Sequence, residues 1–515
     1  MMIEKSRTSN SIRNIVVSVG CQLATLVLSF ITRTLFIHIL GTDYLGINGL
    51  FSNILSVMSL ADLGFGTAIV YTLYRPLMEN DQKQISAVIN FYGKVYTIVA
   101  AIMLIVGVGI VPFLKYLVNL ENELPFLHLY YILFLLDSVC SYLYVYKSAV
   151  LEADQKNYIV KTNRTVFLLI TNVVKLIVLY CTRNYFSYLI VQIIGTLLSN
   201  ISIYRIAEKK YPYLRNSNEQ LGKTEKKSII DNVKSLFLYK IGGVILNSTD
   251  NILISAIVST TVVGLYSNYS LLFGTVVTFS EIVFGALNAS VGNLNASKTR
   301  MEVYKTFKMI NFSNFWLYGF CSITLFCMMD DFIYLWLGKQ YVLGTTTTLI
   351  ICLNVFMPGM LSAVGCFRNA TGLFRQTKYI FCMTAFLNLV LSIWFGKMWG
   401  LNGIILATSV ARLLTNVWFE PYMLIKRYFS QSYIRYFIRL VSYYLVTALF
   451  IFGIYEIKKR GFVVTPVTFV IELLLCIGSI NIVFFLLFFK TEEFKALVDR
   501  LKPFLNKLLR RGKLI

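Results

Sequence analysis

Long uninterrupted apolar stretches recur along the whole 515-residue chain and constrain its fold more than any other feature. Many reach the roughly 20 residues that an α-helix needs to cross the hydrocarbon core of a bilayer. Only 14% of the residues are charged, about half the share of a soluble protein. Barrel strands would alternate in polarity over about 10 residues, whereas these stretches are continuously apolar. We therefore predict an all-α membrane protein.

Counting the apolar segments between polar breaks predicts about fourteen membrane-spanning helices. They are expected near residues 13–38, 44–73, 90–114, 125–150, 159–181, 185–207, 235–258, 262–288, 306–329, 345–367, 377–396, 402–425, 436–457 and 466–489. An even number of spans places both termini on the same side of the membrane.

Lysine and arginine are distributed unevenly between the two sides, and this bias sets the predicted orientation. With the N-terminus inside, the inner segments hold about 38 of the 48 Lys and Arg residues, and the outer turns about seven. Three of those seven form the run Lys458, Lys459 and Arg460, which fits the rule least well. We expect both termini in the cytoplasm. The net charge of +23 follows from this bias and from attraction to membrane lipids, without a nucleic-acid partner.

A polar, basic segment at residues 208–233 divides the first six spans from the rest, and we predict that it is a cytoplasmic linker. The two halves show a weak internal similarity. Sliding the sequence by 218 positions brings Gly46, in TDYLGING, onto Gly264, in TVVGLYSN, and places Arg33 opposite Asn251, beside Asp250. Because both halves start on the same side, such a repeat is parallel and its axis runs along the membrane normal.

Several ionisable residues fall inside predicted spans, where an uncompensated charge is costly. They are Arg33, Lys175 and Arg412, together with Asp62, Asp137, Asp250 and Glu281. Arg33 and Lys175 can reach an interface by snorkelling, but the short side chains of Asp62 and Asp250 cannot. We therefore expect protein or water around these two aspartates. Asp250 is the most exceptional, since it lies in the middle of the apolar stretch KIGGVILNSTDNILIS.

Pro358 and Gly359 interrupt the predicted span 345–367, in the sequence NVFMPGM. A proline in a helix frees backbone groups that only a bundle interior or a cavity can satisfy. We predict a hinge at these two residues. Gly242 and Gly243 loosen the span 235–258, or equally allow helices to pack closely there.

Enzyme chemistry has little support in the sequence. No GxxxxGK[ST] loop is present and the nine cysteines form no CxxC pair, so no cofactor or metal is predicted. Asp330 and Asp331 resemble the paired acids that membrane glycosyltransferases place on an outer loop. The neighbouring Tyr334, Trp336 and Tyr341 instead favour an aromatic belt with an acidic edge. We do not expect an enzyme.

Five stretches resemble the polysaccharide transport, or Wzx-type, flippases, a family of the superfamily (MOP) that also contains MATE multidrug exporters and the lipid II flippase. They are RTLFIHILGTDYLGINGLFSNILSVMSLADLGFGTAIVYTLYRPL, GGVILNSTDNILIS, VGLYSNYSLL, LWLGKQY and ARLLTNVWFEPYMLIKR. The resemblance implies two six-helix lobes in a V around a central cavity, plus two C-terminal helices. The N-lobe is then 1–207, the linker 208–233, the C-lobe 234–425, the last two spans 426–490 and a basic cytoplasmic tail 491–515.

The resemblance also implies a function. Such flippases move undecaprenyl-pyrophosphate-linked oligosaccharides from the inner to the outer leaflet of the bacterial cytoplasmic membrane, for capsule, O-antigen or exopolysaccharide synthesis. Alternating access is the expected mechanism, with polysaccharide polymerase machinery as a partner. The alternatives are a cation-coupled, MATE-like multidrug exporter and a membrane glycosyltransferase or polymerase.

A sugar pyrophosphate needs a polar and partly cationic path through hydrocarbon. We predict that Arg33, Lys175 and Arg412 line this path, because guanidinium and ammonium groups bind phosphate oxygens. Other polar side chains are predicted to bond to sugar hydroxyls, or alternatively to bond one helix to another. These are Asn48, Asn247, Asn251, Asn268, Tyr269 and Asn416.

Asp250 and Asp62 are predicted to couple transport to a proton or sodium gradient. A desolvated carboxylate favours its neutral form, and a nearby cation reverses that preference. Two other interpretations remain open for Asp250: an ion-pair latch with Arg33, and hydrogen bonding between helices.

Overall fold

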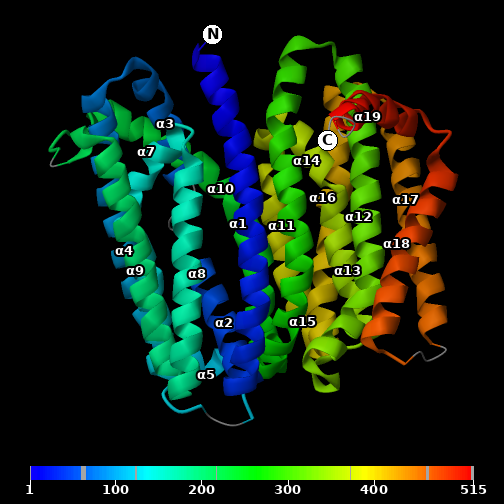
Figure 1. Ribbon diagram of the computed structural model, residues 1–515, viewed down its shortest axis with the longest axis horizontal. Helices are drawn as coiled ribbons and strands as arrows, with labels where there is room; N and C mark the ends of the chain where they lie inside the picture. Colours follow the sequence, from blue (N-terminus) through cyan, green and yellow to red (C-terminus); the bar gives the residue numbers. More distant parts are fainter. Residues whose placement is uncertain are drawn as a thin grey trace. The chain divides into compact units, whose positions relative to one another are not determined.

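The computed structural model describes residues 2–59, 65–121, 124–215, 217–371, 373–459 and 463–511, and all regular structure within these ranges is helical (Figure 1). The chain divides into two compact units, unit 1 (Met1–Gly264) and unit 2 (Leu265–Ile515). Twelve helical segments among the described residues are long and apolar enough to cross a membrane. The prediction of a helical, multi-span membrane protein is therefore confirmed.

Two expected spans, 377–396 and 402–425, correspond to one long segment, Tyr379–Tyr428. Its helix α15 (Phe374–Leu414) has a non-helical residue inside it, Gly400, with φ of 58°. Asn388 Nδ2 donates to Thr408 Oγ1 at 2.9 Å across this point, so the chain folds back on itself there. The expected span 44–73 is divided between α2 (Thr42–Met58) and α3 (Phe65–Glu79). The count of fourteen spans stays a prediction.

Unit 1 is built from helices that run alongside one another (Figure 1). Helix α8 lies against α1 and α9, α6 lies against α4 and α9, and α10 lies against α2. The remaining bounds are α1 (Met2–Leu40), α4 (Gln82–Ile110), α5 (Leu114–Leu117), α6 (Leu127–Tyr142), α7 (Ser148–Ala153), α8 (Asn157–Thr182), α9 (Tyr185–Lys210) and α10 (Lys223–Leu253), with 3₁₀ turns at Val111–Phe113, Val145–Lys147 and Pro212–Leu214 and a π-helical segment at Ile254–Val258. Helix α11 (Thr260–Ser297) begins in unit 1, and from Leu265 onward it belongs to unit 2.

The segment predicted as a linker is held against unit 1. Lys147, which is 4% exposed, donates from Nζ to Glu208 Oε1 at 2.6 Å and to the carbonyl of Leu214 at 3.0 Å. Asn90 donates from Nδ2 to the carbonyls of Ser217 at 2.8 Å and Glu219 at 3.1 Å. These bonds satisfy backbone groups that helices would otherwise pair, so the linker has a defined course.

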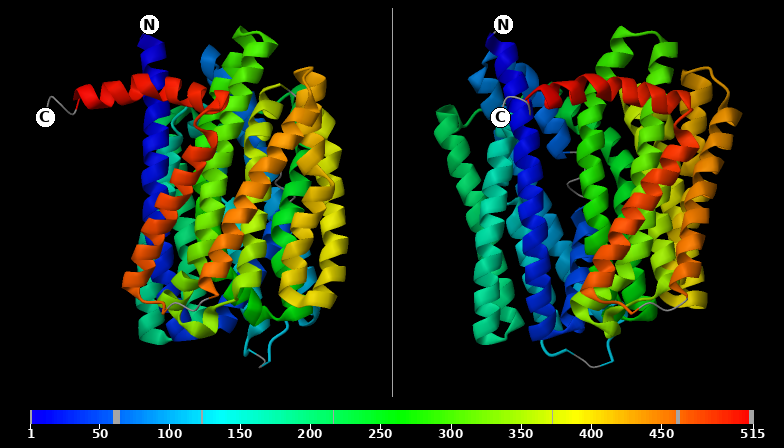
Figure 2. Two further views of the ribbon diagram at one scale, coloured as in Figure 1. Left: turned by 90° about the vertical axis from the view of Figure 1, so that its right-hand side faces the viewer. Right: turned by 45° about the vertical axis from the view of Figure 1, so that its right-hand side comes forward.

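Unit 2 is organised around α12 (Arg300–Leu337), which lies against α13, α17, α18 and α19. Phe315 is fully buried and stacks on Tyr443 of α17, with ring centroids 4.0 Å apart. The bounds are α13 (Thr345–Met360), α14 (Ser362–Ala370), α16 (Asn416–Tyr422), α17 (Tyr433–Lys458), α18 (Pro466–Phe488) and α19 (Glu492–Arg511), with a 3₁₀ turn at Lys339–Tyr341 and a π-helical segment at Met423–Tyr428. Helix α19 runs across the ends of the other helices of this unit (Figure 2).

Candidate functional site

Two of the predicted cationic residues, Arg33 and Lys175, interact with the same side chain in unit 1, Tyr188. Lys175 Nζ lies over the Tyr188 ring, 4.4 Å from its centroid. Arg33 is close enough to Tyr188 for an electrostatic interaction. Arg33 lies on α1, Lys175 on α8 and Tyr188 on α9, and α8 packs against both other helices. Lys175 is 7% and Tyr188 4% exposed, so this charge is held away from lipid by protein.

A chain of hydrogen bonds connects the ammonium group of Lys175 to the half-buried carboxylate of Asp137. Lys175 Nζ donates to Gln192 Oε1 at 3.1 Å, and Gln192 Nε2 donates to Asp137 Oδ2 at 2.7 Å. The other carboxylate oxygen accepts from Thr196 Oγ1 at 2.6 Å. Gln192 and Thr196 are one turn apart on α9, so they address both oxygens of Asp137 on α6. The amide of Gln192 thus lies between the ammonium group of Lys175 and the carboxylate of Asp137 and bonds to both.

These four residues, Asp137, Lys175, Gln192 and Thr196, line a cavity of about 540 Å³ between α6, α8 and α9, named here the unit 1 cavity. Further polar side chains complete its wall, namely Ser141, Arg164, Thr171, Asn172, Ser199 and Asn200. Polar walls of this kind favour water inside the cavity. Ionisable residues in a hydrated cavity within apolar helices are typical of pathways for ions and polar substrates.

Helices α2 and α11 cross in unusually close contact near their N-terminal ends. A Cβ atom on Gly46 would lie 2.0 Å from the carbonyl oxygen of Thr260, and one on Gly264 would lie 2.4 Å from that of Thr42. The contact is reciprocal, since each glycine meets the residue four positions before the other. Only glycine allows two backbones to approach in this way. These residues define the α2–α11 crossing.

Polar bonds surround the α2–α11 crossing. Thr261 Oγ1 donates to Asp43 Oδ1 at 2.6 Å. The backbone N–H of Thr260 donates to the carbonyl of Asn119 at 2.7 Å, and the N–H of Asn119 donates to Thr260 Oγ1 at 2.9 Å. The crossing is therefore fixed by hydrogen bonds as well as by van der Waals contact.

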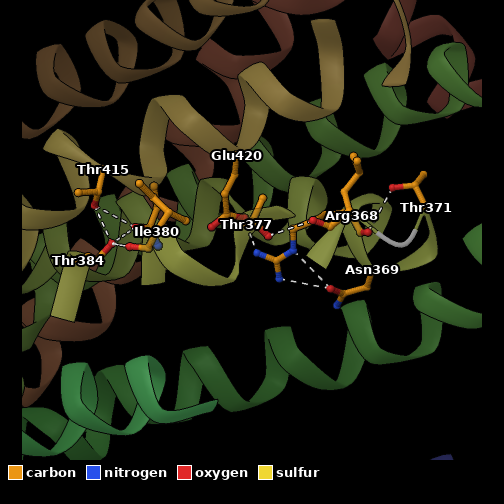
Figure 3. A network of polar contacts seen from close by, with 10 residues as sticks. Arg368, Asn369, Thr371, Thr377, Ile380, Thr384, Thr415 and Glu420 are labelled. Atoms are coloured by element: carbon orange, nitrogen blue, oxygen red, sulfur yellow. Dashed lines mark hydrogen bonds and ion pairs between the residues drawn. The ribbon is translucent and has the colours of Figure 1, made fainter. Parts of the chain in front are cut away.

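Unit 2 contains a buried ion pair that is not evident from the sequence (Figure 3). The guanidinium of Arg368, on α14, donates to Glu420 Oε2, on α16, at 2.5 Å. Both residues are buried, at 5% and 3% exposure. The guanidinium also lies 5.1 Å from the centre of the Phe381 ring and donates from Nε to Asn369 Oδ1 at 3.4 Å. Burial of this pair is tolerated because each charge has a partner.

The helix breaks just after Pro358 and Gly359. Helix α13 ends at Met360 and α14 begins two residues later. Asn314, which is 1% exposed, donates from Nδ2 to the carbonyls of Gly359 at 2.9 Å and Met360 at 3.2 Å. A Cβ atom on Gly359 would lie 2.1 Å from the Tyr318 ring. The side chain of Asn314 thus replaces bonds that a continuous helix would make; movement at this break stays a prediction.

The paired acids Asp330 and Asp331 both have partners in unit 2. Asp330 Oδ1 accepts from Tyr269 OH at 2.6 Å and from Thr348 Oγ1 at 2.7 Å. Asp331 Oδ2 pairs with Lys458 Nζ at 2.5 Å. Tyr269 is fully buried, and its hydroxyl is used in this network, which favours a packing role over sugar binding.

The other predicted site residues lie as follows. Asp250 and Asn251, near the end of α10, are half-buried, as are Asn48 on α2 and Arg412 on α15. Asn268 is fully buried, and Asn416 accepts a hydrogen bond from Thr384. Asp62 lies outside the described residues, as does the side chain of Asn247. The latch between Arg33 and Asp250, the ion coupling and the lobe boundaries all stay predictions.

Charged and polar groups inside the spans of a helical membrane protein are typical of membrane transporters. Residues 11–291, more than half of the chain, match the family of polysaccharide biosynthesis proteins, and the chain belongs to that family. No curated protein matches the sequence.

Solved structures of transporters share the fold. The lipid II flippase MurJ, in an inward closed conformation, matches with a TM-score of 0.66 at 15% identity, over 92% of this chain and 99% of MurJ. An inward-facing multidrug resistance MATE transporter of the MOP superfamily matches with a TM-score of 0.56 at 11% identity, over 78% of this chain and 95% of the other. The Vibrio cholerae MATE transporter VcmN, in its bent form, gives 0.53 at 13% identity, over 80% and 95%. At these identities the likeness concerns the fold alone.

Proposed function

We propose that this protein is a flippase that moves undecaprenyl-pyrophosphate-linked oligosaccharides from the inner to the outer leaflet of the bacterial cytoplasmic membrane. The polysaccharide biosynthesis family and the fold shared with the lipid II flippase both support this. The observation that carries the proposal is that Lys175, which lines a polar cavity of about 540 Å³, and Arg33 both interact with Tyr188. A pyrophosphate is the part of the substrate that needs such groups most.

The arrangement suggests how binding and energy input are linked. Lys175 is a mobile point charge, and Arg33 offers a planar fork for two oxygens. When the ammonium of Lys175 turns toward a pyrophosphate, its bond to Gln192 is lost and Asp137 loses a nearby cation. Loss of a nearby cation removes an interaction that favours the ionised form of a carboxylate. We therefore add Asp137 to Asp250 and Asp62 as a candidate for coupling to a proton or sodium gradient.

In this proposal the chain performs no chemistry on its substrate, works by alternating access, and has both termini in the cytoplasm. The product on the outer leaflet is then a substrate for polysaccharide polymerase machinery. The charge bias of the sequence supports this orientation, because the exceptional cation Lys458 is paired with Asp331.

Flipping in proteoliposomes tests the function. A fluorescent undecaprenyl-pyrophosphate oligosaccharide is placed in both leaflets, and the fraction accessible to an external glycosidase is followed with and without proton or sodium gradients. We expect the wild-type protein to accelerate exchange. Arg33→Gln and Lys175→Met should slow it at least about tenfold, as expected for removing a charged contact worth about 1.5–3 kcal/mol. The matched control Lys210→Gln removes an exposed lysine and should have no effect.

Wild-type protein that leaves the substrate in its original leaflet under every gradient would overturn the proposal. A MATE-like exporter is the second candidate, since the MATE transporters share the fold. Efflux of a cationic dye from the same vesicles, without movement of the lipid-linked sugar, would establish that candidate instead. A glycosyltransferase or polymerase has less support, because Asp330 and Asp331 are engaged by Tyr269, Thr348 and Lys458.

A further inference from the structure

The C-terminal helix α19 is anchored to unit 2 by charged residues in its first turn. Glu493 is 5% exposed, binds Arg439 of α17 and lies 3.8 Å from Lys308 Nζ of α12. Lys308 Nζ is also 3.3 Å from Glu492 Oε2. One lysine and one arginine from two spans thus hold the start of α19 in place.

Aromatic packing and a tight turn give α19 its direction. Phe494 stacks on Trp316 of α12, with ring centroids 5.9 Å apart and an interplanar angle of 25°. In the turn that follows α18, Thr491 Oγ1 donates to the carbonyl of Phe488 at 2.7 Å. The helix therefore leaves the end of α18 across the membrane spans and not along them (Figure 2).

The sequence of α19 is divided into an apolar and a charged side. On a helix of 3.6 residues per turn, one stripe holds every large apolar residue from the first turn onward. Its members are Phe494, Leu497, Val498, Leu501, Phe504, Leu505, Leu508 and Leu509. In the part whose side chains are described, Phe494 and Leu497 pack against the core of unit 2, while Lys495, Asp499 and Arg500 are exposed. In the sequence, the stripe continues beyond the first turn to Leu509.

The charged side of α19 is strongly basic. Six cationic residues and only one acidic residue, Asp499, lie between positions 495 and 511. The cationic residues are Lys495, Arg500, Lys502, Lys507, Arg510 and Arg511. An apolar stripe opposite a basic side is the composition of helices that lie in the interface of anionic membranes.

We propose that α19 is an interfacial helix that binds the headgroups of anionic phospholipids with its basic side and inserts its apolar stripe at the bilayer surface. Charge complementarity identifies the lipid, and the orientation of α19 at the end of the spans brings it to the headgroup level. The anchoring contacts with Lys308 and Trp316 connect this membrane-bound helix to α12. The inference does not depend on the transported substrate.

The test uses the full-length chain in nanodiscs of phosphatidylcholine, alone or with about a third phosphatidylglycerol. The native cysteines are replaced by alanine, and an environment-sensitive fluorophore is attached through Leu505→Cys or through its neighbour Asn506→Cys. The helical period places position 505 on the apolar stripe and position 506 on the charged side. Quenching by aqueous iodide and by spin-labelled lipid reports where each probe lies.

In the anionic nanodiscs we expect the probe at 505 to be quenched by the labelled lipid and protected from iodide several-fold better than the probe at 506. In phosphatidylcholine alone at high salt, the protection should be lost. The combined variant Lys502→Gln, Lys507→Gln and Arg510→Gln should lose it in anionic nanodiscs as well. The matched control Lys502→Arg, Lys507→Arg and Arg510→Lys should keep it.

Two results would overturn the proposal. Protection at 505 that is equal in both kinds of nanodisc and in the neutralised variant would show that headgroup charge is not what α19 binds. Equal access of iodide to both probes in every nanodisc would leave the stripe free for a protein partner instead. The midpoint of thermal unfolding, unchanged between the neutralised variant and the control, excludes a general loss of folding.

Discussion

The carboxylate of Asp43 accepts a hydrogen bond from the hydroxyl of Thr261 at 2.6 Å, and these two residues are 218 positions apart. The same separation superposes the two halves of the sequence, and it also relates Gly46 to Gly264. The α2–α11 crossing therefore joins residues that the weak sequence similarity makes equivalent, and its close approaches are reciprocal.

Gly264→Ala should destabilise the protein. The added Cβ would lie 2.4 Å from the carbonyl oxygen of Thr42, and a backbone atom cannot move aside as the tip of a side chain can. Separating the helices should cost about 1–3 kcal/mol, as overpacking commonly does. The midpoint of thermal unfolding in detergent measures the effect. Gly274→Ala, on the same helix but with open space around its Cβ, is the control and should leave the midpoint unchanged or raise it.

A double-mutant cycle measures the bond between Asp43 and Thr261. Asp43→Ala and Thr261→Val each remove one partner, and the double variant removes both. We expect a coupling free energy of about 1 kcal/mol, because the second substitution costs little once the first has broken the bond. Strictly additive losses would show that the 2.6 Å contact does not contribute to stability.

The ion pair of Arg368 and Glu420 should show a strong asymmetry between single and double substitution. Either Arg368→Met or Glu420→Gln leaves a buried group without its charged partner and should cost about 3–5 kcal/mol. The double variant Arg368→Met with Glu420→Leu should recover most of this loss, since no charge is then buried. Yield of folded protein and thermal unfolding are the measurements. A double variant as unstable as the sum of the singles would contradict this account.

Gln192→Leu should slow transport without unfolding the protein. It removes the amide that bridges Lys175 and Asp137 but keeps a side chain of similar size. We expect flipping to fall about tenfold, corresponding to about 1.4 kcal/mol in the rate-limiting step. Gln192→Glu, which keeps an acceptor for Lys175 but loses the donor to Asp137, should change the dependence of the rate on pH. Wild-type rates and pH dependence in both variants would remove the unit 1 cavity from the mechanism.

Asn314→Leu should weaken the break between α13 and α14. The carbonyls of Gly359 and Met360 would lose the donor that now satisfies them in a buried position. Leaving buried acceptors unpaired costs about 1–3 kcal/mol. Thermal unfolding and hydrogen exchange of residues 355–365 should both report this, with Ser313→Ala, on the neighbouring position of α12, as a control. Exchange confined to other helices would argue against the role of Asn314.

The sequence predicts the helical membrane fold well, because the length and polarity of apolar stretches are properties of the chain itself. The reversal near Gly400 was also predictable as a boundary between two spans. Arg33 and Lys175 stood out for the same reason, since a cation in an apolar stretch is costly wherever it lies. Their common neighbour Tyr188 did not stand out, because aromatic residues are frequent throughout these helices.

Contacts between helices were not predictable from the sequence. Gln192 and Asp137 meet only because α6 and α9 pack in one particular rotation, and a single sequence does not encode that rotation visibly. Arg368 and Glu420 are inconspicuous in the sequence because each lies near the end of a predicted span, where charged residues normally meet water. The sequence does show opposite charges at the predicted inner ends of these two spans. Only the packing of α14 on α16 shows that the two charges pair with each other.

The pairing of Asp331 with Lys458 has a consequence for the biogenesis of the protein. Asp331 emerges from the ribosome 127 residues before Lys458. In the proposed orientation, Asp331 of α12 lies on the outer side before α17 is made, and its pairing with Lys458 offsets one of the cations that contradict the orientation rule. In a circular permutant that makes α17 before α12, this neutralising acid would come too late to guide α17 across.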